Sequence, residues 1–243
     1  MNLIVEQGNT SLKVAVFDNE RILSVNYKDS DDISWIDKIF EQYRPTKCIM
    51  SSVAGKDDTL INILKENLSY FLWFDEYTLV PIRIEYKTKD TLGKDRIAAV
   101  IGAKYSQPDR NILVIDAGTA ITYDVLEKSG IFIGGNISPG LTTRFRSLNT
   151  FTKKLPLIKE KDDVPFLGTC TESAILAGVV SGIVFEMDGY IDALKSKYSD
   201  IFIFLTGGHS FYFERRLKNH IFADANLVLN GLNRILKYNA EKN

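Results

Sequence analysis

The chain carries the same acid-glycine-hydroxyl turn twice, and this internal repeat limits its possible folds more than any other feature. The segment VEQGNTSLKVAVF, residues 5–17, places Glu6 and Gly8 at the joint of two β-type runs. The segment NILVIDAGTAITYDVL, residues 111–126, repeats the plan with Asp116 and Gly118 in the matching positions. Because acid, glycine and polar residue recur in the same order, we interpret the two segments as a duplication rather than a chance likeness.

The elements that follow each copy of the turn also correspond. The expected order in each half is a meander of three strands, then helix, strand and helix, which predicts two α/β domains, each with a mixed sheet. The two turns would face each other across a cleft between the domains, which we place at residues 1–108 and 109–243. Helical periodicity covers residues 34–43, 58–68, 141–148, 171–194 and 227–238, and further strands are expected at 21–27, 47–53, 131–137 and 201–208.

Composition and charge exclude several classes of protein. The net charge is −1 and the pI about 6.2, so no nucleic-acid partner is predicted. The two cysteines, Cys48 and Cys170, are far apart and lack metal-ligand spacing, and there are only two histidines; these facts argue against a zinc site or a disulfide framework and fit a reducing cytoplasm. We see no signal peptide. The longest apolar segment, residues 174–185, is too short for a membrane span and predicts a buried helix.

The repeated turns suggest phosphate binding. A glycine turn brings backbone N–H groups within reach of phosphate oxygens, and a neighbouring hydroxyl adds a donor. Residues 8–11 fit this description, and Lys13 could neutralise charge or point to solvent. Since Glu6 and Asp116 would repel phosphate, an acid here makes sense if a cation or its water lies between them. A plain hydrogen bond to the turn is the alternative role.

Two further motifs fit a ligand site. LTGGHS, residues 205–210, reads as a strand that enters a helix through two glycines, where adenosine or phosphate could approach the backbone. His209 fits a helix-entry residue better than a catalyst. GKDR, residues 93–96, opens a helix with Asp95 in its first turn, where the helix dipole favours a carboxylate. In the cleft, Asp95 could accept a proton from an alcohol while Arg96 holds an anionic group; helix capping is the alternative.

The chain resembles the type III pantothenate kinases, members of the acetate kinase, sugar kinase, Hsp70 and actin superfamily. The resemblance covers nearly the whole chain and implies two ribonuclease H-like (actin-like ATPase) domains. The motifs that carry it are EQGNTSLK (6–13), LGKDR (92–96), DAGTAITYD (116–124), GGNISPGL (134–141), GTCTESAILAG (168–178) and LTGG (205–208).

The resemblance implies phosphorylation of pantothenate by ATP, with Mg²⁺, to 4′-phosphopantothenate, the first step of coenzyme A synthesis. Asp95 would be the proton acceptor, and Asp116 would bind a monovalent cation, K⁺ or NH₄⁺. A homodimer is implied, with the substrate site near the subunit interface. The implied ATP contacts are Glu6, Gln7, Gly8, Asn9, Thr10, Ser11, Leu12, Lys13 and Thr119. The implied pantothenate contacts are Tyr86, Gly93, Lys94, Asp95, Arg96 and Thr171.

The sequence departs from the family pattern at Glu6, where aspartate is usual, at Gln7, where an apolar residue is usual, and at Lys89, near which a proline is common. Three alternatives keep the fold. The first is a kinase for another small alcohol or sugar, or a phosphatase, and the second is a nucleotide-binding regulator without turnover. The third is an actin-like assembling protein, which would need longer insertions than this chain holds.

Overall fold

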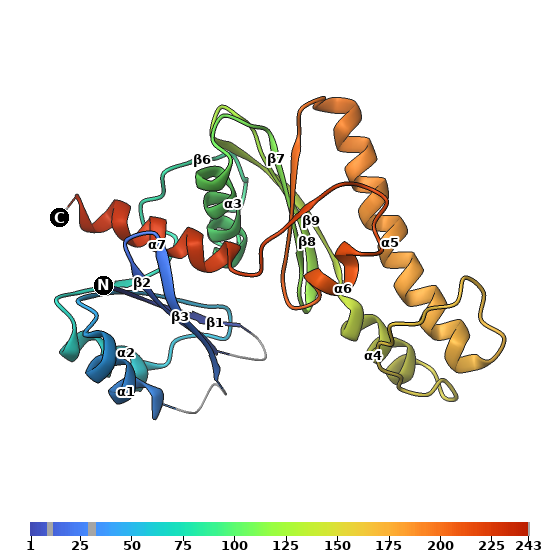
Figure 1. The fold of residues 1–243 in the computed structure, drawn as a ribbon, viewed down its shortest axis with the longest axis horizontal. Coiled ribbons are helices and arrows are strands. Elements are labelled where there is room, and N and C mark those ends of the chain that lie inside the picture. Colours follow the sequence, from blue (N-terminus) through green and yellow to red (C-terminus); the bar gives the residue numbers. More distant parts are fainter. Residues whose placement is uncertain (9–11, 29–32, 243) are drawn as a thin grey trace. The chain divides into compact units, whose positions relative to one another are not determined.

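The structure is a computed structural model that describes residues 1–8, 12–28 and 33–242. Contacts within the chain divide it into two units. Unit 1 comprises Met1–Ser106 together with Asn226–Asn243, and unit 2 comprises Gln107–Ala225. Each unit has a mixed sheet covered by helices (Figure 1), so the predicted α/β class is confirmed.

The sheet of unit 1 has its first strand at the centre. The strand order is β3-β2-β1-β4-β5, in which β1 is antiparallel to β2 and parallel to β4. The bounds are β1 Asn2–Gln7, β2 Leu12–Asp18, β3 Arg21–Lys28, β4 Lys47–Ser52 and β5 Tyr70–Trp73; a two-residue strand, β6 (Arg83–Ile84), is not part of this sheet.

Helices lie on both faces of this sheet. Helices α1 (Trp35–Tyr43) and α2 (Asp58–Asn67) bury Trp35, Leu60 and Leu64 against one face. The side chain of Asp57 caps α2 by accepting a hydrogen bond from the Leu60 N–H at 3.0 Å. Helices α3 (Lys94–Ser106) and α7 (Leu227–Ala240) lie on the other side of the sheet (Figure 1).

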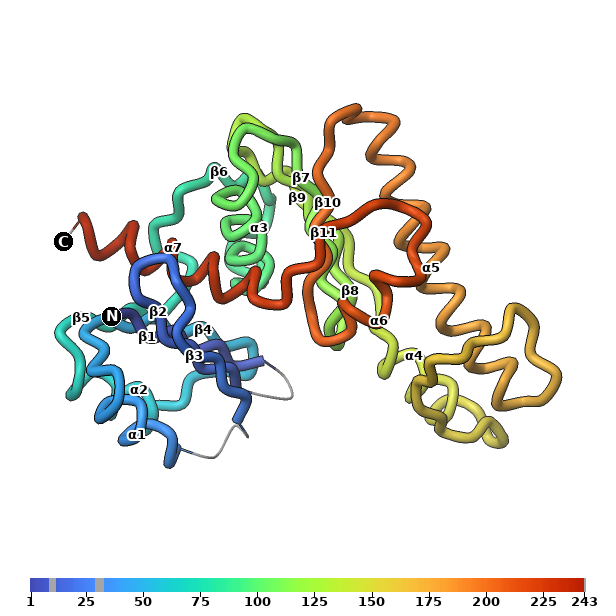
Figure 2. The backbone as a smooth tube through the Cα atoms, viewed as in Figure 1, coloured from blue at the N-terminus to red at the C-terminus, as the bar shows by residue number. Residues whose placement is uncertain are grey.

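Helices α3 and α7 cross at a pair of glycines. A methyl group at Gly231 would overlap the carbonyl oxygen of Ala98 and lie 2.6 Å from its carbonyl carbon. A methyl group at Gly102 would overlap the carbonyl oxygen of Leu227. The two backbones therefore approach each other more closely than any residue with a Cβ would allow, and the two helices cross in contact with each other (Figure 2).

Unit 2 repeats the plan of unit 1. Its strands adjoin in the order β11-β10-β7-β8-β9, with β7 antiparallel to β8 and parallel to β10. This is the same order and the same sense as β5-β4-β1-β2-β3 in unit 1. The bounds are β7 Ile112–Ala117, β8 Ala120–Leu126, β9 Ile131–Pro139, β10 Phe202–Thr206 and β11 Phe222–Ala223.

The helices of unit 2 are α4 (Leu141–Phe151), α5 (Thr171–Lys197) and α6 (Ser210–Glu214). Helix α5 buries Ile175, Ile183 and Met187 in the core of the unit. It is longer than the apolar segment 174–185 suggested, and by length and composition alone it could cross a membrane. Half of its most apolar stretch is buried inside the structure, as in a core helix.

The segment after Ala225 does not belong to the unit in which we expect it, since the expected domains are residues 1–108 and 109–243. The first boundary lies close to that position, at Ser106 and Gln107, but residues 226–243 group with unit 1 instead of unit 2. The reason is the packing of α7, which contacts α3, β1 and β4.

Candidate active site

The two acids of the repeated turns occupy equivalent places in the two sheets. Glu6 is the next-to-last residue of β1, and Asp116 is the next-to-last residue of β7. Glu6 lies opposite Ser51 of the parallel neighbour β4, and Asp116 lies opposite Thr206 of the parallel neighbour β10. Each acid thus stands at the carboxyl end of a central strand beside a buried hydroxyl, where α/β folds commonly bind ligands.

In unit 1, Glu6 faces Lys13 across the antiparallel pair β1 and β2. The Lys13 Nζ lies 3.2 Å from Oε2 of Glu6. That oxygen is buried and lacks a partner with hydrogen-bond geometry in the described residues, so charge alone holds the contact. The strand pair therefore places two opposite charges, Glu6 and Lys13, next to each other where the turn begins.

The rest of this turn is only partly described. The Gln7 Oε1 accepts a hydrogen bond from Ser52 Oγ at 2.9 Å, which ties β1 to the end of β4. The Leu12 side chain is 1% exposed and belongs to the apolar core, so only its backbone could meet a nucleotide. Gly8 is half-buried. Asn9, Thr10 and Ser11 lie outside the described residues.

In unit 2, the Asp116 carboxylate lies between two glycines. Gly207 has φ +91°, and a methyl group there would overlap Oδ1 of Asp116 and lie 2.6 Å from the carbonyl carbon of Ala117. A methyl group at Gly118 would lie 3.1 Å from the same oxygen. The glycines leave room around a carboxylate, and oxygen ligands in such a cradle suit a hard cation.

The turn after Asp116 is held by the start of α4. The backbone carbonyl of Thr119 accepts hydrogen bonds from the Gly140 N–H at 3.0 Å and from Thr143 Oγ1 at 2.7 Å. A methyl group at Gly140 would overlap the carbonyl oxygen of Gly118. The Thr119 side chain is exposed, so its hydroxyl is presented at the surface while its backbone is fixed.

The LTGGHS segment adds to the same place. The His209 N–H donates to the carbonyl of Ala117 at 3.0 Å, just before α6 begins. The Nδ1 of His209 and the Oγ of Ser210 are buried, and neither has a hydrogen-bond partner in the described part of the chain. Gly207, Asp116 and these polar atoms therefore gather around the end of β7.

The GKDR segment opens α3 in unit 1 as expected. The Asp95 Oδ1 accepts a hydrogen bond from the backbone N–H of Arg96 at 2.8 Å. A methyl group at Gly93 would lie 2.5 Å from this oxygen, so glycine leaves the room that the carboxylate occupies. Arg96 is 6% exposed, and its guanidinium carbon lies 5.7 Å from the centre of the Tyr86 ring. The Lys94 Nζ donates to the carbonyl of Leu92 at 3.3 Å.

Thr171 is the first residue of α5 and is exposed. The Ser173 Oγ accepts hydrogen bonds from the N–H groups of Thr169 and Cys170, both at 3.0 Å, and so fixes the entry to the helix. Hydrogen bonds from Ser173 lower the pKa of the exposed Cys170 thiol. These hydrogen bonds therefore hold the exposed Thr171 in a defined position at the start of α5.

Sequence reasoning missed a cluster of four polar side chains in unit 2: Tyr123, Ser138, Arg144 and Glu186. They come from β8, β9, α4 and α5. No short motif joins them, because each is contributed by a different element.

The predicted site residues fall into both units. Glu6 to Lys13, Tyr86 and residues 93–96 belong to unit 1, whereas Asp116, Thr119 and Thr171 belong to unit 2. Within unit 1, the structure brings Tyr86 to Arg96. Within unit 2, it brings Gly207 to Asp116. The cleft that would unite the two sets stays a prediction.

Family and sequence comparisons agree with each other. The model of the family described as Type III pantothenate kinase matches residues 2–193. The type III pantothenate kinase of Bacteroides fragilis strain YCH46 is 44% identical over 239 residues, which are 98% of this chain and 98% of that one.

Solved structures show the same fold at lower identity. A conserved Baf family protein from Campylobacter jejuni superposes with a TM-score of 0.63 at 24% identity, over 98% of this chain and 99% of that one. A glucokinase from an Antarctic psychrotroph superposes with a TM-score of 0.54 at 12% identity, over 98% of each chain. The predicted actin-like ATPase fold is therefore confirmed.

Proposed function

Because the chain belongs to the type III pantothenate kinase family and thus phosphorylates pantothenate with ATP in coenzyme A biosynthesis, we propose roles for its residues in that reaction. Asp95 accepts the proton of the pantothenate hydroxyl, Arg96 and Tyr86 hold the substrate, and Asp116 binds a monovalent cation beside ATP. The observation that carries this proposal is the arrangement at the start of α3, where Gly93 makes room for the Asp95 carboxylate.

Asp95 is suited to orient and deprotonate an alcohol. Phosphoryl transfer passes through a loose transition state, so positioning of the hydroxyl dominates and the proton is taken late. The Arg96 N–H holds Oδ1 of Asp95 at 2.8 Å, which leaves Oδ2 for the substrate. The first turn of α3 also favours a negative charge through the helix dipole.

Arg96 and Tyr86 form the substrate-holding pair of this proposal. The guanidinium is almost fully buried and lies against the Tyr86 ring. A fixed, weakly hydrated guanidinium binds a carboxylate well, and pantothenate carries one. Gly93, Lys94 and the exposed Thr171 are proposed as further contacts.

The ATP phosphates are proposed to lie against the turn between β1 and β2, with Thr119 as a contact from unit 2. Lys13 provides a cation that now balances Glu6 at 3.2 Å. Gly8 leaves the backbone open to phosphate oxygens. For the turn residues Asn9, Thr10 and Ser11, the proposed contact with ATP rests on the family resemblance alone.

The residues around Asp116 fit the proposed cation. Its carboxylate is half-buried, and the two flanking glycines leave space beside Oδ1 that any Cβ would fill. A bound K⁺ or NH₄⁺ would offset the charge of ATP there, and Mg²⁺ would accompany ATP.

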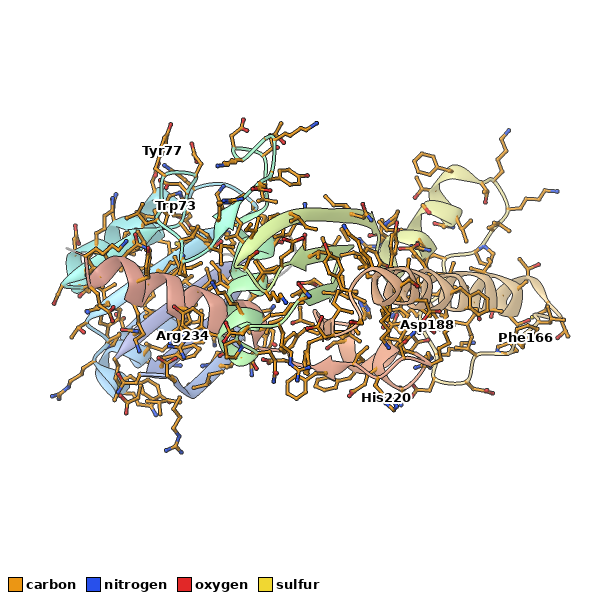
Figure 3. All side chains as sticks on the ribbon, turned by 90° about the horizontal axis from the view of Figure 1, so that it is seen from above. Trp73, Tyr77, Phe166, Asp188, His220 and Arg234 are labelled. Carbon is orange, nitrogen blue, oxygen red and sulfur yellow. The ribbon has the colours of Figure 1, made fainter. Side chains whose placement is uncertain are left out.

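We also propose that the enzyme is a cytoplasmic homodimer with a second copy against α5. The helix exposes Gly178 and the Phe185 ring, which is 64% exposed, and the half-buried Gly182 has open space above it, as Gly178 does. A cavity of about 500 Å³ adjoins Phe185 and Phe166, and the Phe166 ring points away from the body of unit 2 (Figure 3). Light scattering should give twice the chain mass; a monomer at micromolar concentration would contradict this.

A coupled assay of ADP release tests the proposed roles. Pantothenate should be required, and replacement of K⁺ by Na⁺ or a bulky organic cation should lower the rate strongly. Asp116→Asn should weaken the cation effect and ATP binding together. Equal rates with all three cations would contradict the cation role, and absence of pantothenate-dependent turnover with every cation would contradict the reaction itself.

A further inference from the structure

Three polar side chains of unit 2 surround the Glu186 carboxylate and form a closed hydrogen-bonded cluster with it. The Tyr123 Oη donates to Oε1 of Glu186 at 2.7 Å. Ser138 Oγ and Arg144 Nη2 donate to Oε2 at 3.2 and 2.6 Å, and Arg144 Nη2 also donates to Ser138 Oγ at 2.8 Å. Both oxygens of a half-buried carboxylate are therefore engaged by three elements.

The charges in this cluster balance each other. Burial of Glu186 favours its neutral form, but hydrogen bonds from Arg144, Tyr123 and Ser138 outweigh it and keep the pKa of Glu186 below the ordinary value. Burial and the bond to Glu186 raise the pKa of Tyr123. At neutral pH the cluster therefore contains an ionised Glu186 paired with Arg144, and removal of either partner leaves the other charge uncompensated.

Arg144 connects the cluster to the start of α4. Its Nε donates to the carbonyl of Pro139 at 2.8 Å, so the guanidinium fixes the corner at which β9 ends. The next residue, Gly140, donates to the Thr119 carbonyl, and Thr143 donates to the same oxygen. An unbroken path of contacts thus runs from Glu186 to the turn that follows Asp116.

We propose that Glu186, acting through Arg144, is a positioning residue that holds the turn of residues 116–119 in the geometry needed for ATP. The inference rests on the proposed place of Asp116 and Thr119 beside ATP. Without the Glu186 anchor, Arg144 loses its fixed orientation, and the start of α4 no longer fixes the Thr119 carbonyl. Because small displacements of binding groups are costly, the loss appears in ATP affinity and spares the pantothenate contacts of unit 1.

The decisive variant is Glu186→Gln, which keeps the shape and removes the charge. We expect the Kd and KM for ATP to rise about tenfold and the KM for pantothenate to change less than about twofold. Arg144→Lys is the milder variant, because it keeps the charge and loses the bond to Pro139; we expect a rise of about threefold for ATP. Calorimetric titration with a non-hydrolysable ATP analogue gives Kd without any need for turnover.

The chain offers matched controls for both chemical changes. Asp192 lies on the same helix as Glu186, and its carboxylate is ion-paired with Lys218 at 2.7 Å. Asp192→Asn therefore removes a paired carboxylate that lies outside the cluster. Tyr198→Phe removes a hydrogen bond to a carboxylate outside the cluster, to Glu127 at 3.0 Å, and so controls for the loss of a single hydrogen bond in unit 2. Both controls should leave the Kd for ATP at the wild-type value.

The outcomes separate the inference from the site assignment. If Glu186→Gln and Arg144→Lys lower the melting temperature but leave the Kd for ATP unchanged, while Asp116→Asn weakens ATP binding, the cluster is structural and the inference is wrong. If Asp116→Asn also leaves the Kd for ATP unchanged, ATP does not bind at this turn. The proposed ATP site and the inference are then both wrong. Equal rises in the KM values for ATP and pantothenate would likewise overturn it.

Discussion

The glycine crossing of α3 and α7 predicts a large stability cost for a single methyl group. In Gly231→Ala, the new Cβ would overlap the carbonyl oxygen of Ala98 and lie 2.6 Å from its carbonyl carbon and 3.0 Å from the backbone nitrogen of Gly102. These are backbone atoms of a regular helix, so no side chain can swing aside. The two helices must move apart, or α7 must shift along α3.

The expected cost follows from the packing that such a movement disrupts. Helix α7 buries Leu232, Ile235 and Leu236 fully in unit 1. Overpacking of a tight core typically lowers the free energy of unfolding by about 1–3 kcal/mol. The higher helix propensity of alanine offsets only about 1 kcal/mol of this loss. Because the clash is with backbone, we expect a net loss of about 2 kcal/mol in the free energy of unfolding.

The assay can report on unit 1 alone. The chain has two tryptophans, and both Trp35 and Trp73 belong to unit 1. Urea unfolding followed by tryptophan fluorescence should show a midpoint lowered by about 1 M, if the slope is about 2 kcal/mol per M. Gly189→Ala is the matched control, because Gly189 lies in α5 of unit 2 with open space around it. It should leave the fluorescence midpoint unchanged. A wild-type midpoint for Gly231→Ala would refute the reasoning.

Three further predictions concern the site. Asp95→Asn should lower kcat by about two to four orders of magnitude with the calorimetric Kd for ATP nearly unchanged, since asparagine cannot accept a proton; a near wild-type kcat would return Asp95 to a capping role. Arg96→Ala should chiefly raise the KM for pantothenate in steady-state kinetics, and a fall in kcat alone would contradict its substrate-holding role. The depressed pKa of Glu186 means that its contribution to stability is complete above its ordinary value of 4.5 and is lost as the pH falls through the folded-state pKa. The stability cost of Glu186→Gln in urea should therefore be full at neutral pH and shrink in acid; a cost independent of pH would contradict this.

The elements near the repeated turns could be predicted from sequence because their signals are local. An acid and a glycine at the end of an apolar strand suffice to place Glu6 and Asp116, and the structure puts both at the next-to-last position of a central strand. The start of α3 at Lys94 is also where the GKDR segment predicts it. These features depend on residues a few positions apart, so one sequence holds the information.

Other features depend on partners that are distant in the chain. Tyr123 and Glu186 are 63 residues apart, and nothing in either neighbourhood indicates the other. The periodicity of residues 227–238 correctly predicts a helix, but it gives no sign that Gly231 packs on Gly102 of unit 1. Leu12 shows a related limit, because the motif that we propose to bind phosphate through its backbone carries a side chain that belongs to the core.

The return of α7 to unit 1 has a consequence for synthesis on the ribosome. Residues 1–106 emerge first, then the whole of unit 2, and only afterwards the helix that completes unit 1. At ordinary rates of translation, unit 2 takes on the order of ten seconds to make. During that interval the face of α3 around Gly102 has no helix to cover it.

This delay gives the nascent chain a defined vulnerable state. Unit 2 is continuous and can close its own core as soon as it emerges, whereas unit 1 must wait with apolar surface exposed, which favours binding by chaperones or aggregation. A messenger truncated before the codon for Leu227 would leave that state permanent. Docking of α7 on α3 is therefore the folding step that completes the core of unit 1.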